Sequence, residues 1–261
     1  MSELVLVEVR DQSAILTINR ADKRNALSRA LISAIHEAVD RVGDDPKVRA
    51  VILTGAGSVF CAGMDLEELQ GSLDANAQET PVWDDALRLA RLYDRLYRLP
   101  KPTIAAVNGA AVAGGAGLVS VCDLAVSVPG AKFGYPEVRR GLVAAMVLPH
   151  LMRHVGERVA RHLLLTGELI DAEAARAAGF LNLVVPPEKL LDQALAWARA
   201  CAEGGPMALA LTKDLLTRFS RQALSIEEAA HASAAPRLTE ECRQGLEAFF
   251  AKRPAPWLSG G

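Results

Sequence analysis

Hydrophobic residues near the start of the chain change from a strand-like to a helix-like spacing. Residues 4–10 (LVLVEVR) and 13–20 (SAILTINR) gather apolar and β-branched side chains on either side of Asp11 and Gln12, which predicts a hairpin. After Ser28, a candidate helix N-cap, apolar residues recur at helical spacing, and Gly43 is expected to end this helix. The chain is therefore predicted to begin with a hairpin followed by an amphipathic helix.

The same change of spacing continues along the next part of the chain. Short apolar runs at residues 49–55, 103–109 and 124–128 are typical of buried strands. Helices are expected between them, at about 83–98 and 116–121. Because strand and helix alternate, the sequence predicts an α/β fold.

The C-terminal part of the chain is predicted to be mainly helical. After Leu142 the pattern is helical except for one further strand at 181–185. We place a boundary near Gly204-Gly205-Pro206, because the segments beyond it are typical of helices with no strand between them. This divides the chain into a core, residues 1–204, and a helical region, residues 205–261.

One long segment of the predicted core is polar and has few apolar residues. Residues 71–81 (GSLDANAQETP) have the composition of a flexible loop. Such a loop could cover a substrate, or it could be a solvated excursion at the surface.

Composition restricts the class of protein. The 261 residues carry a net charge of -2, so no basic excess indicates a nucleic-acid partner. The four cysteines are far apart in the sequence and form no CxxC pair, which favours a reduced, cytoplasmic protein. The N-terminus does not have the pattern of a signal peptide, and no apolar run approaches the roughly 18 residues of a membrane span.

Candidate chemistry is concentrated in three segments that are rich in small residues. Residues 60–66 (FCAGMDL) and 108–117 (NGAAVAGGAG) contain glycines that let a ligand carbonyl approach main-chain N–H groups. Two such donors from separate loops can stabilise a developing enolate oxygen. Residues 133–137 (FGYPE) add a carboxylate, Glu137, as a candidate acid/base. Together the segments predict a site that moves a proton next to a thioester carbonyl.

These segments, with residues 19–28 (NRADKRNALS), 122–126 (CDLAV) and 138–143 (VRRGLV), resemble the crotonase, or enoyl-CoA hydratase/isomerase, family over roughly residues 4–185. The resemblance implies a crotonase-like spiral of ββα units with a C-terminal helical trimerisation region, and a homotrimer or a homohexamer built as a dimer of trimers. It also implies that the N–H groups of Met64 and Gly114 form the oxyanion hole and that Glu137 is the general acid/base.

The resemblance also implies positions that bind the substrate and its CoA moiety. Lys23 and Arg24 match the segment that lies along the CoA nucleotide, although a basic pair is also common on a solvated turn. The other expected positions are Ala26, Ala62, Asp65 and Leu66, and Lys252-Arg253 could reach the CoA of a neighbouring subunit. No metal or redox cofactor is implied, because coenzyme A is part of the substrate.

The chain departs from the two-glutamate hydratases of this family at Gly117, which stands where those enzymes have a second glutamate. Hydration of a 2-enoyl-CoA and a shift of its double bond both stay open, because one base suffices for isomerisation. In a hydratase, Asp65, Glu67, Glu68 or Tyr135 could hold the water. Further alternatives are a methylglutaconyl-CoA-type branched enoyl-CoA hydratase and a non-catalytic acyl-CoA-binding protein.

Two other kinds of site find little support in the sequence. The glycines of residues 108–117 do not have the GxGxxG spacing of a dinucleotide-binding turn. His150 and His154 have the i,i+4 spacing of zinc ligands, but no third ligand accompanies them, so ordinary helix surface is favoured.

Overall fold

The structure, a computed structural model, describes residues 3–71, 79–219 and 226–254. It begins with the predicted hairpin, in which β1 (Val5–Arg10) pairs antiparallel with β2 (Ser13–Ile18). Asp11 and Gln12 have φ angles of 48° and 62°, the left-handed conformation that suits a two-residue hairpin turn. The hairpin prediction is confirmed.

The larger sheet continues from this hairpin with parallel strands. It has six strands in the order β1-β2-β3-β5-β7-β10, where β3 is Ala50–Gly55, β5 is Thr103–Val107, β7 is Leu124–Ser127 and β10 is Leu183–Val184. Every residue of β5 and most of β3 are buried, as expected for parallel strands covered on both faces. All four parallel strands coincide with apolar runs that the sequence analysis identified.

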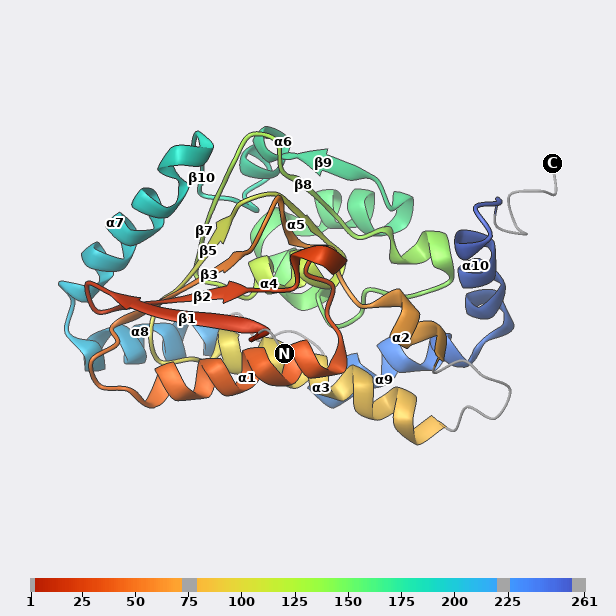
Figure 1. Cartoon of the computed structure of the whole chain (residues 1–261), viewed down its shortest axis with the longest axis horizontal. Helices are drawn as coiled ribbons and strands as arrows, with labels where there is room; N and C mark the ends of the chain where they lie inside the picture. Colours follow the sequence, from red (N-terminus) through yellow and green to blue (C-terminus); the bar gives the residue numbers. More distant parts are fainter. Residues whose placement is uncertain (1–2, 72–78, 220–225, 255–261) are drawn as a thin grey trace.

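A second, four-stranded sheet was not predicted from the sequence. It has the order β4-β6-β8-β9, formed by β4 (Val59–Cys61), β6 (Ala110–Val112), β8 (Lys132–Gly134) and β9 (Leu169–Asp171). The pairs β3–β4, β5–β6 and β7–β8 each place one strand in each sheet. Successive pairs stack in parallel, which gives the spiral that the family resemblance implies (Figure 1).

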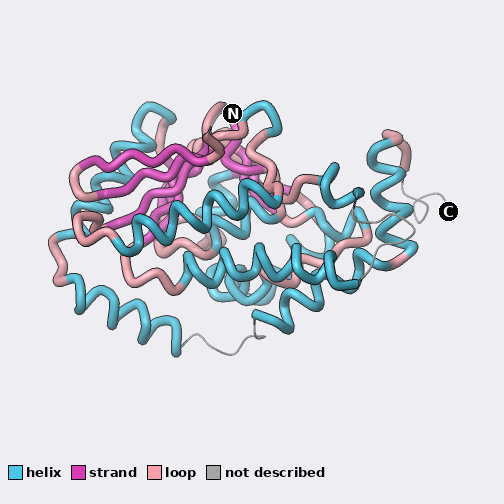
Figure 2. Tube along the Cα trace, turned by 60° about the horizontal axis from the view of Figure 1, so that its bottom comes forward, coloured by secondary structure: helices cyan, strands magenta, loops and turns pink. Residues whose placement is uncertain are grey.

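Ten α-helices lie within the described residues. They are α1 (Arg29–Asp44), α2 (Leu66–Gly71), α3 (Glu79–Tyr97), α4 (Gly114–Ser120), α5 (Leu148–Thr166), α6 (Ala172–Ala177), α7 (Leu190–Ala202), α8 (Pro206–Phe219), α9 (Ile226–Ala234) and α10 (Glu240–Phe250). Figure 2 shows the strands gathered on one side with long helices beneath them.

The helix boundaries follow local sequence signals with small differences. The Oγ atom of Ser28 accepts a hydrogen bond from the N–H of Leu31 at 3.1 Å, so Ser28 caps α1 as predicted. Helix α1 continues through Gly43 to Asp44 instead of ending at the glycine. Helix α5 is kinked at Gly156, whose φ of 68° is left-handed.

One large hydrophobic core links the sheets to the surrounding helices. Helix α1 packs against the hairpin and α3, and α7 packs against β3 and β5. Helix α9 packs against α3 through a smaller alanine-rich cluster, which brings the C-terminal region against the core. The described part of this region is helical without a strand, as predicted, and the domain boundary itself stays a prediction.

Two other predictions concern the polar segment at 71–81 and membrane-spanning helices. Of the polar segment at 71–81, residues 72–78 lie outside the described residues, and 79–81 belong to α3. In the described part of the chain, no helix combines the length and the apolar character that crossing a membrane requires.

Candidate active site

The three predicted segments meet at one pocket, a cleft that is partly open to solvent. Its lining is mostly apolar and comes from the turn after β4, from α2, α3, β6 and α4, from the segment after β8, and from the C-terminal helices. Met64, Gly114 and Glu137 all line this pocket, so the structure brings together the residues assigned to catalysis. A largely apolar pocket with a few convergent polar groups is typical of a ligand site.

Close contact between two backbones shapes one wall of the pocket. Gly63 has a φ of 94°, and a Cβ atom at this position would lie 2.9 Å from the Cβ of Ala113 and 3.3 Å from the nitrogen of Gly114. A larger residue than glycine is therefore excluded at position 63, both by conformation and by space. The segments that carry the Met64 and Gly114 N–H groups consequently lie side by side.

The N–H groups of Met64 and Gly114 have no backbone acceptor within the described residues. Gly114 is the first residue of α4, and the first N–H groups of a helix have no intrahelical partner. The preceding residue, Ala113, has φ 52° and ψ -123°, a conformation that costs a non-glycine residue free energy. Two unpaired N–H groups on neighbouring backbone segments are what an oxyanion hole requires, and this role stays a prediction for Met64 and Gly114.

Glu137 lies in the pocket without a hydrogen-bonding partner on one of its oxygens. Pro136 and Glu137 begin a 3-10 helix, η2 (Pro136–Arg140), directly after β8. The Oε2 atom is buried and accepts no hydrogen bond from the described residues. Burial raises the pKa of Glu137 from 4.5 to about 7, against the opposing effects of a backbone hydrogen bond and the charge of Arg140. A carboxyl group with this pKa can both accept and return a proton near neutral pH.

Tyr93 fills the space beside Gly117. A Cβ atom on Gly117 would lie 2.4 Å from the Oη of Tyr93 and 2.6 Å from a methyl of Val147, so no second glutamate fits there. The Tyr93 hydroxyl donates to the carbonyl oxygen of Gly114 at 2.7 Å. Burial raises the pKa of Tyr93 well above its ordinary value, so the hydroxyl keeps its proton. Sequence analysis missed Tyr93 because it lies on α3, inside an ordinary helical pattern.

The positions expected to contact the substrate and CoA divide into two groups. Ala62 and Leu66 line the pocket. Lys23 and Arg24 lie on an exposed turn, where the Nζ of Lys23 pairs with Glu67 at 3.0 Å. The carbonyl oxygen of Ala26 accepts from Arg20 at 3.0 Å. Lys23, Arg24 and Ala26 thus lie outside the pocket lining, and a role in CoA binding stays a prediction for them.

Asp65 is held by the protein itself. Its Oδ2 atom accepts from Arg20 at 2.6 Å, and its Oδ1 accepts from the N–H of Glu67 at 3.0 Å. Burial acts to raise the pKa of Asp65, but these hydrogen bonds and the charge of Arg20 hold it below its ordinary value. Asp65 therefore fixes the start of α2, and its carboxylate does not line the pocket.

The other groups considered for holding water are also outside the pocket. Glu67 pairs with Lys23, and the carboxylate of Glu68 accepts from the N–H of Arg29 at 2.8 Å. Tyr135 is 1% exposed and does not line the pocket. Of the residues with a hydroxyl, Tyr93 and Ser233 are the ones that line it.

The two histidines with zinc-like spacing contact other parts of the protein. The Nε2 of His154 lies 2.8 Å from the carbonyl oxygen of Ser120, and the Nδ1 of His150 lies 3.2 Å from Arg153. Burial lowers the pKa of His150 to about 3. Among the residues that the structure describes, no three His, Cys, Asp or Glu side chains are grouped as a metal site would require.

The spiral of paired strands and the pocket between its glycine-rich turns define the crotonase class of enzymes. The sequence profile of the family described as Enoyl-CoA hydratase/isomerase matches residues 9–260, so the chain belongs to this family.

Individual relatives match over almost their whole length. A Thermus thermophilus protein, named provisionally as an enoyl-CoA hydratase, is 45% identical over 92% of this chain and 95% of its own. The crotonyl-CoA hydratase of Syntrophomonas wolfei is 35% identical over 98% of both chains. The crystal structure of an enoyl-CoA hydratase/isomerase from Xanthobacter autotrophicus Py2 superposes with a TM-score of 0.87, at 30% identity and 98% coverage of both chains.

Proposed function

We propose that this enzyme binds an acyl-CoA thioester in the pocket and adds water to a 2-enoyl-CoA. The observation that carries this proposal is the buried Glu137 in the same pocket as the unpaired N–H groups of Met64 and Gly114. The hydratase names of the Thermus thermophilus and Syntrophomonas wolfei relatives support hydration over other reactions of the family.

In this mechanism the thioester oxygen accepts hydrogen bonds from Met64 and Gly114. Glu137 takes a proton from water as the water oxygen bonds to C3, and the electrons of the C2–C3 double bond move toward the thioester as an enolate. The two N–H groups stabilise the charge that develops on the enolate oxygen. Glu137 then returns its proton to C2, which gives a 3-hydroxyacyl-CoA and restores the carboxylate.

Tyr93 is the best-placed group to hold the attacking water. Its hydroxyl lies against Gly117, where a second carboxylate would be needed, and its proton is engaged by the Gly114 carbonyl. The remaining lone pair of the hydroxyl can accept a hydrogen bond from water. The same hydrogen bond holds the Gly114–Gly115 peptide group, next to the Ala113–Gly114 peptide group that carries one of the two proposed donors.

A second candidate reaction is isomerisation between 3-enoyl and 2-enoyl thioesters. The observation that favours it is the single carboxylate in the pocket lining, Glu137. One base can take a proton from C2 and deliver it to C4 while the same N–H groups hold the enolate. Branched enoyl-CoA substrates of the methylglutaconyl type fit either reaction.

We further propose that the enzyme needs no separate cofactor and assembles as a homotrimer or homohexamer. Coenzyme A arrives as part of the substrate, and the thioester activates its own α-carbon once the oxygen is held.

The proposed function is tested by incubating the protein with a trans-2-enoyl-CoA and following the mass of the thioester, with Glu137→Gln as the control. We expect a gain of one water that depends on Glu137. No gain with trans-2-enoyl-CoA but interconversion of a 3-enoyl-CoA would replace hydration with isomerisation. Binding without turnover of either thioester would favour a non-catalytic acyl-CoA-binding protein.

A further inference from the structure

Arg237 is a buried cation with almost no partners among the residues that the structure describes. It lies on a 3-10 helix, η4 (Ala235–Leu238), lines the same pocket as Glu137 and is only 4% exposed. Its Nη2 donates to the Oγ of Ser233 at 3.4 Å, and no other hydrogen bond from its guanidinium reaches a described residue. A buried guanidinium with so few acceptors is costly unless another group completes its hydrogen bonds.

No acidic side chain within the described residues lies close enough to Arg237 to form an ion pair. The acid whose charge acts on it is Asp85, but this carboxylate is engaged by Arg29 through two hydrogen bonds, at 2.7 and 2.5 Å. The described residues therefore leave the charge of Arg237 largely uncompensated.

A second arginine adds to the positive charge of the pocket. The Nε of Arg140 is buried without an acceptor among the described residues, and its Nη1 makes only a long bond of 3.4 Å to the Pro136 carbonyl. Its guanidinium lies over the ring of Phe249 at 4.4 Å. The charged groups of the lining are these two arginines and Glu137, so the pocket favours an anion.

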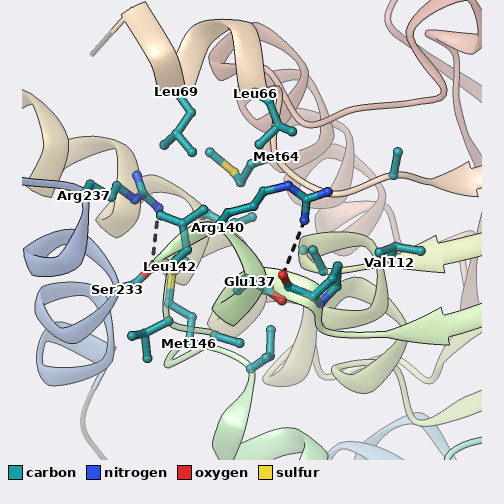
Figure 3. Close-up of a pocket in the computed structure, with 18 of the residues that line it drawn as sticks. Met64, Leu66, Leu69, Val112, Glu137, Arg140, Leu142, Met146, Ser233 and Arg237 are labelled. Atoms are coloured by element: carbon teal, nitrogen blue, oxygen red, sulfur yellow. Dashed lines mark hydrogen bonds between the residues drawn. The ribbon is translucent and has the colours of Figure 1, made fainter. Parts of the chain in front are cut away.

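Arg237 and Glu137 lie on different sides of the pocket. Figure 3 shows Arg237 and Ser233 on one side, Glu137 on the other, and the apolar side chains of Leu142 and Met146 in the same cavity. Apolar side chains suit the methylene groups of an acyl chain, whereas an uncharged methyl end would add no acceptor for the guanidinium beyond its long bond to Ser233.

We propose that Arg237, with Ser233 beside it, binds a carboxylate at the far end of the acyl chain, so that the preferred substrates are 2-enoyl-CoA thioesters of dicarboxylic acids. A carboxylate can accept two parallel hydrogen bonds from the guanidinium and a third from the Ser233 hydroxyl. The proposed subsite is argued from Arg237 and Ser233 and does not depend on the reaction, whereas the enoyl chemistry rests on the function proposed above.

Binding of saturated thioesters tests the subsite independently of turnover. Adipyl-CoA and hexanoyl-CoA have acyl chains of equal length, and the first carries the extra carboxylate. By calorimetry on the full chain we expect adipyl-CoA to bind about 10- to 100-fold more tightly than hexanoyl-CoA. Arg237→Met should remove this preference and leave hexanoyl-CoA binding intact, and Arg237→Lys should restore part of it.

Arg243→Met is a matched control, because Arg243 lies exposed on α10 and pairs with Glu240 and Glu247. This variant should keep the wild-type preference. Equal affinities of the wild-type protein for the two thioesters, or a preference that survives Arg237→Met, would overturn the proposal. Ser233→Ala gives a second, milder variant, with an expected loss of part of the preference, in case Arg237→Met does not fold.

Turnover distinguishes failure of the subsite from failure of the proposed reaction. We expect the six-carbon trans-2-enoyl-CoA that ends in a carboxylate to have a lower KM than trans-2-hexenoyl-CoA, and Arg237→Met to abolish the difference. If neither is hydrated while adipyl-CoA binds preferentially, the reaction is wrong and the subsite stands. If both are hydrated with equal KM and the two saturated thioesters bind equally, the subsite is wrong and the reaction stands.

Discussion

The burial of Glu137 suits the catalytic role proposed for it but has a structural cost. Its carboxylate is buried in an apolar pocket, and burial raises its pKa to about 7. Between pH 4.5 and about pH 7, Glu137 therefore carries a proton in the folded protein but not in the unfolded chain. The contribution of Glu137 to the free energy of unfolding is greatest below pH 4.5, and it is lost as the pH rises through about 7.

We expect Glu137→Gln to stabilise the protein at alkaline pH. Above pH 7 the variant avoids burying a charge, so its free energy of unfolding should exceed that of the wild type by up to about 3 kcal/mol. Chemical denaturation at about pH 5 and about pH 8 checks this, because the difference should shrink at the lower pH. An advantage that does not change with pH would contradict the raised pKa.

The same titration should limit catalysis. The carboxylate form of Glu137 accepts the proton in the proposed mechanism, so kcat/KM for a trans-2-enoyl-CoA should fall about tenfold per pH unit below about pH 7. A pH profile at limiting substrate gives the pKa of Glu137 in the free enzyme, and a profile at saturating substrate gives its pKa in the enzyme–substrate complex. A profile that stays flat down to about pH 5 would exclude Glu137 as the base.

Gly117 is restricted by Tyr93 and Val147. A Cβ atom there would clash with both, so Gly117→Ala should lower the free energy of unfolding by about 1–3 kcal/mol. Gly130→Ala is the matched control, because a Cβ atom on Gly130 meets nothing within 4 Å. Combining Gly117→Ala with Tyr93→Phe should cost less than the sum of the single changes. Additive effects in denaturant unfolding would show that the two side chains do not compete for space.

Sequence reasoning identified some pocket residues and could not identify others. Met64, Gly114 and Glu137 lie in local motifs whose glycines and proline signal an unusual backbone, and all three line the pocket. Tyr93 and Arg237 come from helical segments with ordinary patterns, and they reach the pocket only because α3 and the C-terminal helices pack beside it. A residue that reaches the pocket only through packing between distant segments leaves no local signal in the sequence.

Helix α4 depends on direct contact with β4. A Cβ atom on Gly115 would lie 2.1 Å from the carbonyl oxygen of Cys61, so the helix touches the strand backbone at this point. The contact fixes how closely α4 approaches β4, and therefore where the Gly114 N–H lies. Glycine at 115 is therefore a packing requirement, besides the ligand contact proposed for Gly114.

Gly115→Ala should accordingly displace α4 and weaken both stability and function. We expect a lower melting temperature and at least about a tenfold loss of kcat/KM, because the Gly114 N–H moves away from the enolate oxygen. Thermal unfolding and steady-state kinetics measure the two effects. An unchanged kcat/KM would mean that the Gly114 N–H does not contact the reacting thioester.

The predictability of the secondary structure varies with element length. Long periodic segments, such as α1 and α3, and the apolar strands β3, β5 and β7 could be located from their patterns. The strands β4, β6 and β8 have three residues each, and two of them lie inside the glycine-rich motifs or next to them. Their strand conformation follows from pairing with one another across the spiral, which no local window of the sequence contains.

The surface of the chain carries an apolar stripe on α8 that bears on its assembly. Met207, Leu211 and Leu215 recur at every fourth position and are 75%, 57% and 52% exposed. Such a stripe on one helix face is typical of a contact between subunits. The helical region that contains α8 was predicted to mediate trimer formation.

We expect these side chains to be covered by a second copy of the chain. The wild-type protein should sediment as a trimer or hexamer, and Leu211→Glu combined with Leu215→Glu should yield smaller species. Leu165→Glu, at a 70% exposed leucine at the end of α5, serves as the control and should leave the mass unchanged. If the wild-type protein is a monomer, or if the double variant forms the same oligomer as the wild type, this assignment is contradicted.

The alternation of strands between two sheets also has a consequence for synthesis on the ribosome. Met64, Gly114 and Glu137 belong to successive turns of the spiral, and Arg237 follows only near the C-terminal end. The residues proposed as donors and as acid/base are therefore synthesised well before Arg237, and domains begin to fold from the N-terminal side during synthesis. The groups proposed for the reaction thus leave the ribosome before the group that we propose selects among acyl chains.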